Sequence, residues 1–137
     1  MTALEGTGVD VLMGVGGSPE AVLAACALKC LGGEIQCRLW PRDEAERQEA
    51  IAAGLELERV FTSSDLVKGS DVFFAVTGIT DGELVRGVRY FADGARTHSI
   101  VMRSRSGTVR HIEATHNFEK LRRITGIAYE HNAPAKK

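Results

Sequence analysis

The 137-residue chain carries 17 Lys and Arg residues against 18 Asp and Glu residues, a net charge of -1. This length suits one domain with a hydrophobic core and is short for two. The balanced charge lacks the basic excess of nucleic-acid-binding domains, so we expect no nucleic-acid partner. The sequence has no uninterrupted apolar run of about 18 residues and no secretory leader, so we expect no membrane association and a cytoplasmic location.

A strand and a helix joined by a glycine turn are the first predicted elements. Residues 9–15 (VDVLMGV) are apolar without strict alternation, which is typical of a strand covered on both faces, so we expect a central parallel strand. Ser18 is predicted as the N-cap of the following helix, with Pro19 and Glu20 in its first turn. Because Lys29 is the only charge in AVLAACALKCL, we expect this helix to be buried. Gly32 and Gly33 are predicted to end it.

The next elements continue an alternating pattern of strands and helices. Residues 34–40 (EIQCRLW) are predicted as a strand and PRDEAERQEAIAAG as a charged helix ending near Gly54. A short helix is expected at SSDLVKG, followed by an apolar strand over residues 71–77. This order predicts a parallel α/β layer with right-handed crossovers and helices on both faces.

The pattern changes to a period of two after about residue 87. Turn signals at Asp93-Gly94 and Ser106-Gly107 separate short strands within RYFADGARTHSIVMRSRSGTVRHIEATH. We therefore expect a hairpin or meander attached to the parallel part, which makes the sheet mixed. One α/β unit is predicted over residues 1–130, and the polar residues 131–137 are expected to be a disordered tail.

The glycine turn before the first helix is a candidate anion site. Gly14, Gly16 and Gly17 allow close backbone approach to a ligand, and the helix N-terminus offers N–H donors to a phosphate. The dinucleotide fingerprint is not present, since Pro19 stands where its last glycine would be. A Walker A motif is not present either, since the sequence lacks Gly-Lys-Ser/Thr after the turn. Glu20 either satisfies the helix dipole or binds a Mg²⁺ or Mn²⁺ ion that bridges to the phosphate.

Three longer stretches carry a family resemblance. VDVLMGVGGSPEAVLAACALKCLGGEIQCRL, DVFFAVTGITDGELVRGVRYF and ARTHSIVMRSRSGTVRHIEATH together resemble, in this order, the C-terminal part of class II fructose-1,6-bisphosphatases. These are metal-dependent bacterial enzymes, some of which also act on sedoheptulose 1,7-bisphosphate. The resemblance covers roughly residues 8–118 and implies the C-terminal portion of the layered sugar-phosphatase fold.

The resemblance implies a function and two site residues. The family hydrolyses the 1-phosphate of fructose 1,6-bisphosphate in gluconeogenesis, using Mn²⁺ or Mg²⁺, and its full-length members are expected to form homo-oligomers. Its GGxPE turn supplies a substrate-contacting glycine and a metal-ligating glutamate, which correspond here to Gly17 and Glu20. Ala21 departs from the glycine usual after that glutamate, but this change removes no ligand.

The family's other functional segments have no counterpart in this sequence. Its remaining acidic metal ligands, its residues near the attacking water and its basic and Asp-Gly-Asp substrate contacts all lie before the stretch that resembles VDVL. We therefore expect this chain to be a fragment that is inactive alone. The alternative is a noncatalytic α/β module that binds a phosphate-bearing ligand at the Gly14–Gly17 turn, or a partner subunit at the arginine-bearing hairpin.

Several other residues are weaker candidates. Thr77 and Gly78 end a strand and either line the same crevice or serve a turn that needs a positive φ angle. Arginines gather around the predicted hairpin, where a phosphate grip competes with a solvated face or a subunit interface: Arg96, Arg103, Arg105 and Arg110. His111 and His116 flank Glu113, but the histidines and cysteines show no firm metal-ligand spacing. These residues are His98, His111, His116, His131, Cys26, Cys30 and Cys37.

Overall fold

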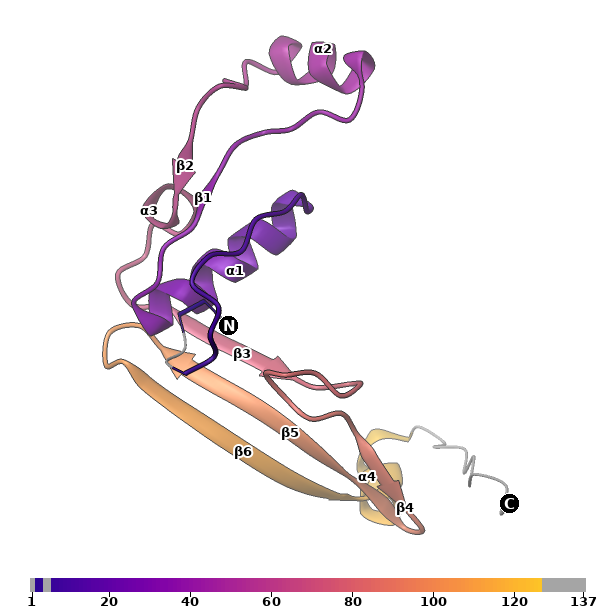
Figure 1. Ribbon diagram of the computed structural model, residues 1–137. Coiled ribbons are helices and arrows are strands. Elements are labelled where there is room, and N and C mark those ends of the chain that lie inside the picture. Colours follow the sequence, from indigo (N-terminus) through magenta and orange to yellow (C-terminus); the bar gives the residue numbers. More distant parts are fainter. Residues whose placement is uncertain (1, 4–5, 127–137) are drawn as a thin grey trace. The chain divides into compact units, whose positions relative to one another are not determined.

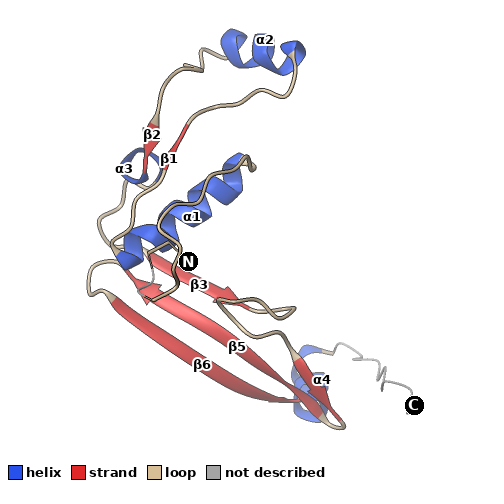
Figure 2. Ribbon diagram, in the orientation of Figure 1, coloured by secondary structure: helices blue, strands red, loops and turns tan. Residues whose placement is uncertain are grey.

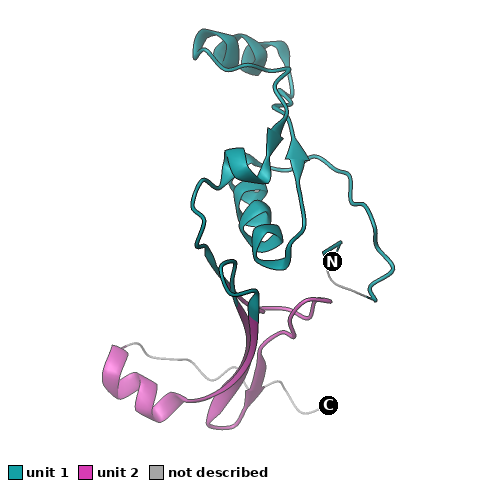
Figure 3. Cartoon of the chain, turned by 90° about the vertical axis from the view of Figure 1, so that its left-hand side faces the viewer, with its two compact units in different colours: residues 1–74, 102–108 teal, residues 75–101, 109–137 magenta. Residues whose placement is uncertain are grey.

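The computed structural model describes residues 2–3 and 6–126, and it contains helices and sheets in two compact units. Unit 1 comprises residues 1–74 and 102–108, and unit 2 comprises residues 75–101 and 109–137 (Figure 3). The predicted tail at 131–137 lies outside the described residues. No helix in the described part is long and apolar enough to cross a membrane.

Helix α1 (Ser18–Leu31) is the longest helix of unit 1 (Figure 1). It ends where predicted, because Gly32 adopts a left-handed conformation with φ 76° and its N–H donates to the Leu28 carbonyl. Only Ala25 and Cys30 of this helix are buried, and Leu23 is 58% exposed. The prediction of a buried helix is therefore wrong for the chain as described, since Val22 and Leu23 are exposed and most other apolar residues of the helix are only partly buried.

Short elements make up the middle of unit 1. Strands β1 (Gln36–Cys37) and β2 (Phe61–Thr62) pair antiparallel, and helix α2 (Glu44–Ala52) lies between them in sequence. The Asp43 side chain caps α2 by accepting a bond from the Glu46 N–H. The predicted strand over 34–40 thus shortens to two residues, while the charged helix forms close to its predicted span and buries none of its residues.

Helix α3 (Ser63–Leu66) is fixed by a capping box and by contacts to the loop after α1. The Thr62 side chain accepts from the Asp65 N–H, and the Asp65 carboxylate accepts from the Thr62 N–H at 2.9 Å. Ser63 is buried, and Glu34 accepts its N–H at 2.7 Å. Lys29 of α1 donates to the Val67 carbonyl at 2.7 Å. These bonds join α1 and α3 within unit 1.

The structure contradicts the predicted central parallel strand over residues 9–15. They form no strand, and all seven are exposed. In Figure 3 the stretch that leads into α1 is an open arch, separate from the helix. A strand covered on both faces requires a neighbouring strand and two packing layers, and the described residues supply neither to this segment.

The larger sheet contains β3 (Phe73–Thr77), β4 (Arg89–Phe91), β5 (Gly94–Arg103) and β6 (Thr108–Asn117) (Figure 2). Strand β5 is central: β3 and β4 both pair with it, and β6 pairs with it as well. Helix α4 (Phe118–Thr125) follows β6 and is capped by Asn117. The buried apolar residues of β5 are Ala95, Ile100 and Met102.

The strand pairs run antiparallel, which corrects the expected parallel layer. Strand β4 pairs with β5 in antiparallel register, with Phe91 opposite Gly94. Backbone hydrogen bonds show that β3 and β5 are antiparallel as well. At the start of β3 the Ser104 N–H donates to the Val72 carbonyl, and after its end the Gly78 N–H donates to the carbonyl of the earlier residue His98. Strands β5 and β6 are joined by a four-residue turn, which permits only antiparallel pairing. The mixed helix and strand class is nevertheless confirmed.

Candidate functional site

The N-terminus of α1 begins one residue earlier than predicted. Gly17, with φ -74° and ψ 157°, is the N-cap, so Ser18 and Pro19 are the first two helical residues and Glu20 is the third. Gly17 lacks a side-chain cap, and its carbonyl accepts the Ala21 N–H at 3.1 Å. The N–H groups of the first turn have no acceptor within the helix, so they face outward as donors. An acidic side chain or an anion can satisfy them.

Glu20 and Gly17, the two site residues implied by the family resemblance, lie side by side. The exposed Glu20 carboxylate folds back over the N-cap, and a Cβ atom added at Gly17 would collide with its Oε2 oxygen. Glycine at position 17 therefore leaves room for this carboxylate. The turn presents a backbone amide and a carboxylate at one exposed place, which are complementary to an anion and a cation respectively.

Gly14 and Gly16 have no local structural requirement for glycine. Neither has a positive φ angle, and a Cβ atom at either position would meet no atom within 4 Å. Glycine in an extended segment costs backbone entropy relative to alanine. A ligand or protein segment outside the described residues that approaches this backbone closely would account for both glycines.

The described residues provide no complete metal site. No three His, Cys, Asp or Glu side chains converge in the part of the chain that the structure describes. Cys26, Cys30 and Cys37 are free thiols, and Cys30 is buried with its Sγ atom 3.6 Å from the Val72 carbonyl. Burial, followed by the neighbouring Cys26, raises the pKa of the Cys30 thiol. Cys30 therefore behaves as a small core residue.

Gly78 is required for close packing and not for a positive φ angle, which corrects one of its predicted explanations. A Cβ atom at Gly78 would overlap the Arg86 carbonyl, and one at Gly87 would lie 2.6 Å from the Thr80 carbonyl carbon. The loop between them closes on itself through Asp81, which accepts the Gly87 N–H at 2.9 Å. This bond, with an ion pair to Arg89, lowers the pKa of the Asp81 carboxyl group.

The other strand-end candidate, Thr77, is engaged within unit 2. Its hydroxyl lies 2.8 Å from the Ser99 hydroxyl on the neighbouring strand β5. This contact supports strand pairing. The structure therefore gives Thr77 a local structural partner, and a ligand-lining role stays a prediction.

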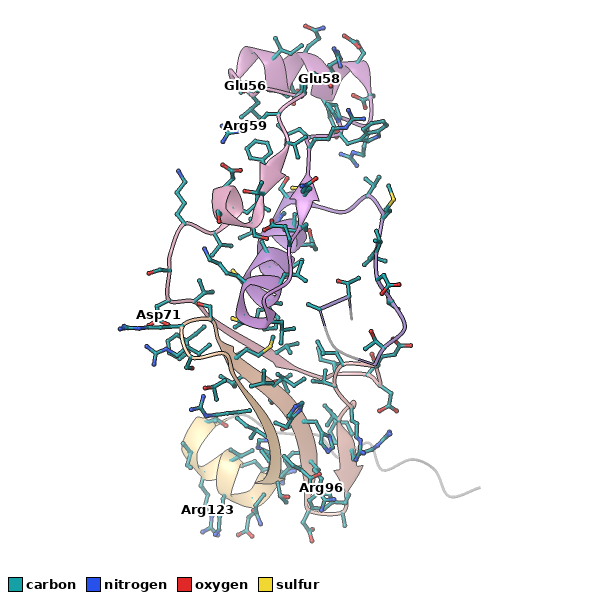
Figure 4. The ribbon with its side chains drawn as sticks, turned by 60° about the vertical axis from the view of Figure 1, so that its left-hand side comes forward. Glu56, Glu58, Arg59, Asp71, Arg96 and Arg123 are labelled. Atoms are coloured by element: carbon teal, nitrogen blue, oxygen red, sulfur yellow. The ribbon has the colours of Figure 1, made fainter. Side chains whose placement is uncertain are left out.

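Two of the four candidate arginines are already paired with carboxylates. Arg103 binds Asp71, labelled in Figure 4, and its guanidinium lies 4.9 Å from the Phe73 ring centroid. The hydrogen bonds from Arg103 lower the pKa of Asp71. Arg96, also labelled, lies 3.3 Å from a Glu113 oxygen. Arg105 and Arg110 are exposed, and Arg105 belongs to the turn after β5 rather than to the strand.

The histidines of the β5–β6 hairpin form cross-strand contacts that sequence reasoning missed. His98 Nε2 lies 2.9 Å from Glu113 Oε2, and His116 Nε2 lies 2.9 Å from the Thr97 hydroxyl. Counting outward from the four-residue turn at 104–107 places position 98 opposite 113. The Ser106-Gly107 signal alone does not give the length of the turn, so it could not have predicted this pairing. His111, with His98 and Glu113, lines a cavity of about 310 Å³ in unit 2. His131 lies outside the described residues.

Comparison with known sequences shows the family. The model of bacterial fructose-1,6-bisphosphatases encoded by glpX matches residues 1–116. The chain therefore belongs to this bisphosphatase family.

Particular relatives sharpen the comparison. The chain is 44% identical, over 124 aligned positions, to a protein of Synechococcus sp. strain JA-2-3B'a(2-13) named D-fructose 1,6-bisphosphatase class 2/sedoheptulose 1,7-bisphosphatase. It is 37% identical over 132 positions to the fructose-1,6-bisphosphatase class 2 of Haemophilus influenzae. These alignments cover 81% and 87% of this chain but only 36% and 40% of the two relatives. The chain thus spans less than half the length of these relatives.

Proposed function

We propose that this chain forms part of a metal-dependent sugar-bisphosphate phosphatase. The reaction removes the 1-phosphate of fructose 1,6-bisphosphate and yields fructose 6-phosphate and inorganic phosphate. The name of the Synechococcus relative adds sedoheptulose 1,7-bisphosphate as a second substrate of that protein. Within this chain, Glu20 binds the metal ion and Gly17 contacts the substrate.

One observation carries this proposal beyond family membership. The turn before α1 contains two glycines that the fold does not require and ends at a carboxylate that lies over a third glycine. Glu20 is exposed, so its carboxylate is accessible to a ligand outside the described chain. The oxygen donor of a carboxylate matches the preference of Mg²⁺ and Mn²⁺.

The roles of the chain's own residues follow from this geometry. A divalent ion, when bound, supplies polarisation of the phosphoryl group and activation of water. Glu20 would hold that ion, whose positive charge would offset the repulsion between the Glu20 carboxylate and a phosphate. Gly17, lacking a Cβ atom, lets the backbone approach the phosphate, and the first-turn N–H groups of α1 donate to its oxygens.

A chimera tests the role of Glu20. Residues 1–137 replace the aligned part of the Synechococcus relative, and phosphate release from fructose 1,6-bisphosphate is measured with Mn²⁺. We expect Glu20→Gln to lower kcat/KM by about 100-fold or more, because even outer-shell changes at metal sites cost about 10- to 100-fold. Glu44→Gln is the matched control, since Glu44 is also an exposed acidic residue in a helix's first turn. Equal rates for the two variants would rule out the ligand role.

The chain alone is expected to be inactive. Mg²⁺ and Mn²⁺ require several oxygen ligands, and no three candidate ligands converge among the described residues. Residues 1–137 should therefore release phosphate no faster than their own Glu20→Gln variant. Turnover above that variant would show that the chain holds a sufficient site.

This incomplete ligand set also favours a second candidate for the chain by itself, namely a noncatalytic module that binds a phosphate-bearing ligand. Calorimetry with fructose 1,6-bisphosphate and with nucleotides, each with and without Mn²⁺, separates the two functions. Mn²⁺-dependent binding of the sugar bisphosphate supports the phosphatase. Metal-independent preference for a nucleotide supports the module.

A further inference from the structure

Strand β6 forms a free edge of the larger sheet. It pairs with β5 and with no other described strand, and Figure 1 shows it as the outermost strand, beside β5. Edge strands are commonly kept short or carry proline or lysine, which discourage pairing with another chain. Strand β6 has ten residues, TVRHIEATHN, and contains neither residue. Such an edge is a template for a further strand.

The backbone groups that point to this edge follow from the neighbouring hydrogen bonds. Just after β6, the Phe118 N–H donates to the Asp93 carbonyl at 3.0 Å. Residues that face the partner strand alternate in an antiparallel pair, so the even-numbered residues of β6 face β5. The odd-numbered residues direct their N–H and C=O groups to the free edge: Val109, His111, Glu113 and Thr115.

The other side of β5 gives the same result independently. The Gly78 N–H donates to the His98 carbonyl, so the even-numbered residues of β5 face β3 and its odd-numbered residues face β6. Because position 98 lies opposite position 113, the odd-numbered residues of β5 lie opposite the even-numbered residues of β6. The assignment of the edge-facing groups therefore holds from both sides.

A second copy of β6 matches this edge in one register. Antiparallel pairing about a two-fold axis places edge-facing residues opposite edge-facing residues. With the axis at Ile112, His111 of each copy lies opposite Glu113 of the other, and an imidazole N–H can donate to a carboxylate. An axis at Glu113 would oppose two like charges, which is destabilising, and an axis at His111 would leave Glu113 opposite Val109.

We propose that β6 is an interface at which a second copy of this chain pairs antiparallel, with Ile112 opposite Ile112. Ile112 is 43% exposed and gains an apolar partner. Glu113 already contacts His98 and Arg96, but the two oxygens of a carboxylate accept several hydrogen bonds. The added contact with His111 of the other copy is therefore compatible with the existing ones. The inference does not depend on the proposed function.

Other occupants match the edge less well. An unrelated extended peptide can use the same backbone groups, but the alternation of His111 and Glu113 is complementary to itself. A polyanion does not match an edge on which Arg110 and Glu113 carry opposite charges. Since ten residues a side are fewer than the roughly 20–30 of a standard interface, we expect a dimer that dissociates on dilution.

Sedimentation of residues 1–137 over a range of concentrations tests the interface. Proline at position 115 removes an edge-facing N–H and no bond to β5, and proline is tolerated at such positions of edge strands. Thr115→Pro should weaken the dimer by about tenfold or more, because each copy loses a donor to the other. Thr115→Val keeps the N–H and the β-branched shape, so we expect this control to change the affinity by less than about threefold.

Disulfide cross-linking tests the register. Ile112 lies in a pair without backbone hydrogen bonds, where the two Cα atoms are about 4.5 Å apart, within the range of a disulfide. The two Ala114 residues would lie about 13 Å apart along the strands. Oxidation should therefore link Ile112→Cys dimers, whereas Ala114→Cys should form no more dimer than the unsubstituted chain, which accounts for Cys26, Cys30 and Cys37.

Three results would overturn the inference, and none of them uses metal or catalysis, so they are distinct from failure of the proposed function. The first is a monomer at every concentration up to about 1 mM. The second is a dimer that Thr115→Pro does not weaken, which would assign association to another surface. The third is cross-linking at position 114 instead of 112. If Thr115→Pro unfolds by circular dichroism, the two cysteine variants decide the question by themselves.

Discussion

The β5–β6 hairpin and the apolar segment at 9–15 were both predicted as strands, yet only the hairpin forms. The two strands of the hairpin are adjacent in sequence, and their turn ends at Gly107, whose φ is +60°. The apolar segment is at least as hydrophobic but has no partner strand among the described residues. Hydrophobicity alone therefore does not determine a strand, because a strand also needs a partner for its backbone N–H and C=O groups.

The same contrast separates the contacts of the two regions. The hairpin buries Ile100 and joins its strands through His98, Glu113, Thr97 and His116. All seven residues of the apolar segment are exposed. We infer that the hairpin contributes to the stability of this chain by itself, whereas the segment contributes little.

The largest expected effect is a difference between two truncations. Ile100→Ala should lower the free energy of unfolding by about 2–5 kcal/mol, the usual cost of truncating a buried aliphatic side chain, since Ile100 is only 3% exposed. Leu12→Ala should change it by less than about 0.5 kcal/mol, as at an ordinary surface site. Urea unfolding of residues 1–137 measures both. Comparable losses would mean that the apolar segment already packs within the isolated chain.

A smaller effect is expected from glycine substitutions in the two regions. Gly107→Ala should cost roughly 1–2 kcal/mol, because a Cβ atom disfavours the left-handed conformation while meeting no neighbour. Gly107→Asn should recover part of this loss. Gly14→Ala should leave stability unchanged or raise it by up to about 1 kcal/mol. Thermal unfolding compares the three variants, and a large loss for Gly14→Ala would reveal a structural role for that glycine.

The smallest effect concerns pH. In unit 1, hydrogen bonds from Arg103 lower the pKa of Asp71, and those from Thr62 and from Ser63 lower the pKa of Asp65 and of Glu34. Because these folded-state pKa values lie below the unfolded ones, their stabilisation is present above about pH 4. It is lost as the pH falls through the lowered values.

Urea midpoints measured between pH 7 and pH 2 check this sign. The midpoint should be constant near neutrality and fall in acid, and Asp71→Asn should reduce the acid-dependent part of that fall. A midpoint that rises as the pH drops below about 4 would contradict the assigned contacts.

Elements with local signals could be predicted from the sequence. Gly32 ends α1, the charged helix α2 forms close to its predicted span, and the turn before Gly107 forms the hairpin. Each of these depends on residues within a few positions of one another. The N-cap of α1 was placed one residue late because Ser18 has a side chain typical of a cap, whereas Gly17 holds that position.

Features that depend on distant partners could not be predicted in the same way. The predicted parallel strand direction was wrong, because β3 pairs with β5, about 25 residues later in the chain. Hydrophobic patterns do not show whether two strands pair parallel or antiparallel. In the candidate site, Gly17 and Glu20 were identified by family resemblance, since an acidic residue in a helix's first turn is also explained by the helix dipole alone. The structure adds that their atoms lie together.

Mn²⁺ binding tests the central proposal, that α1 carries one ligand of a metal site completed by the remaining part of the family fold. Electron paramagnetic resonance measures free Mn²⁺ during titration of the chimera, its Glu20→Gln variant and its Glu44→Gln control. We predict an affinity about 10- to 100-fold lower, or weaker still, for Glu20→Gln and an unchanged affinity for the control. An affinity for Glu20→Gln equal to that of the unsubstituted chimera would contradict the proposal.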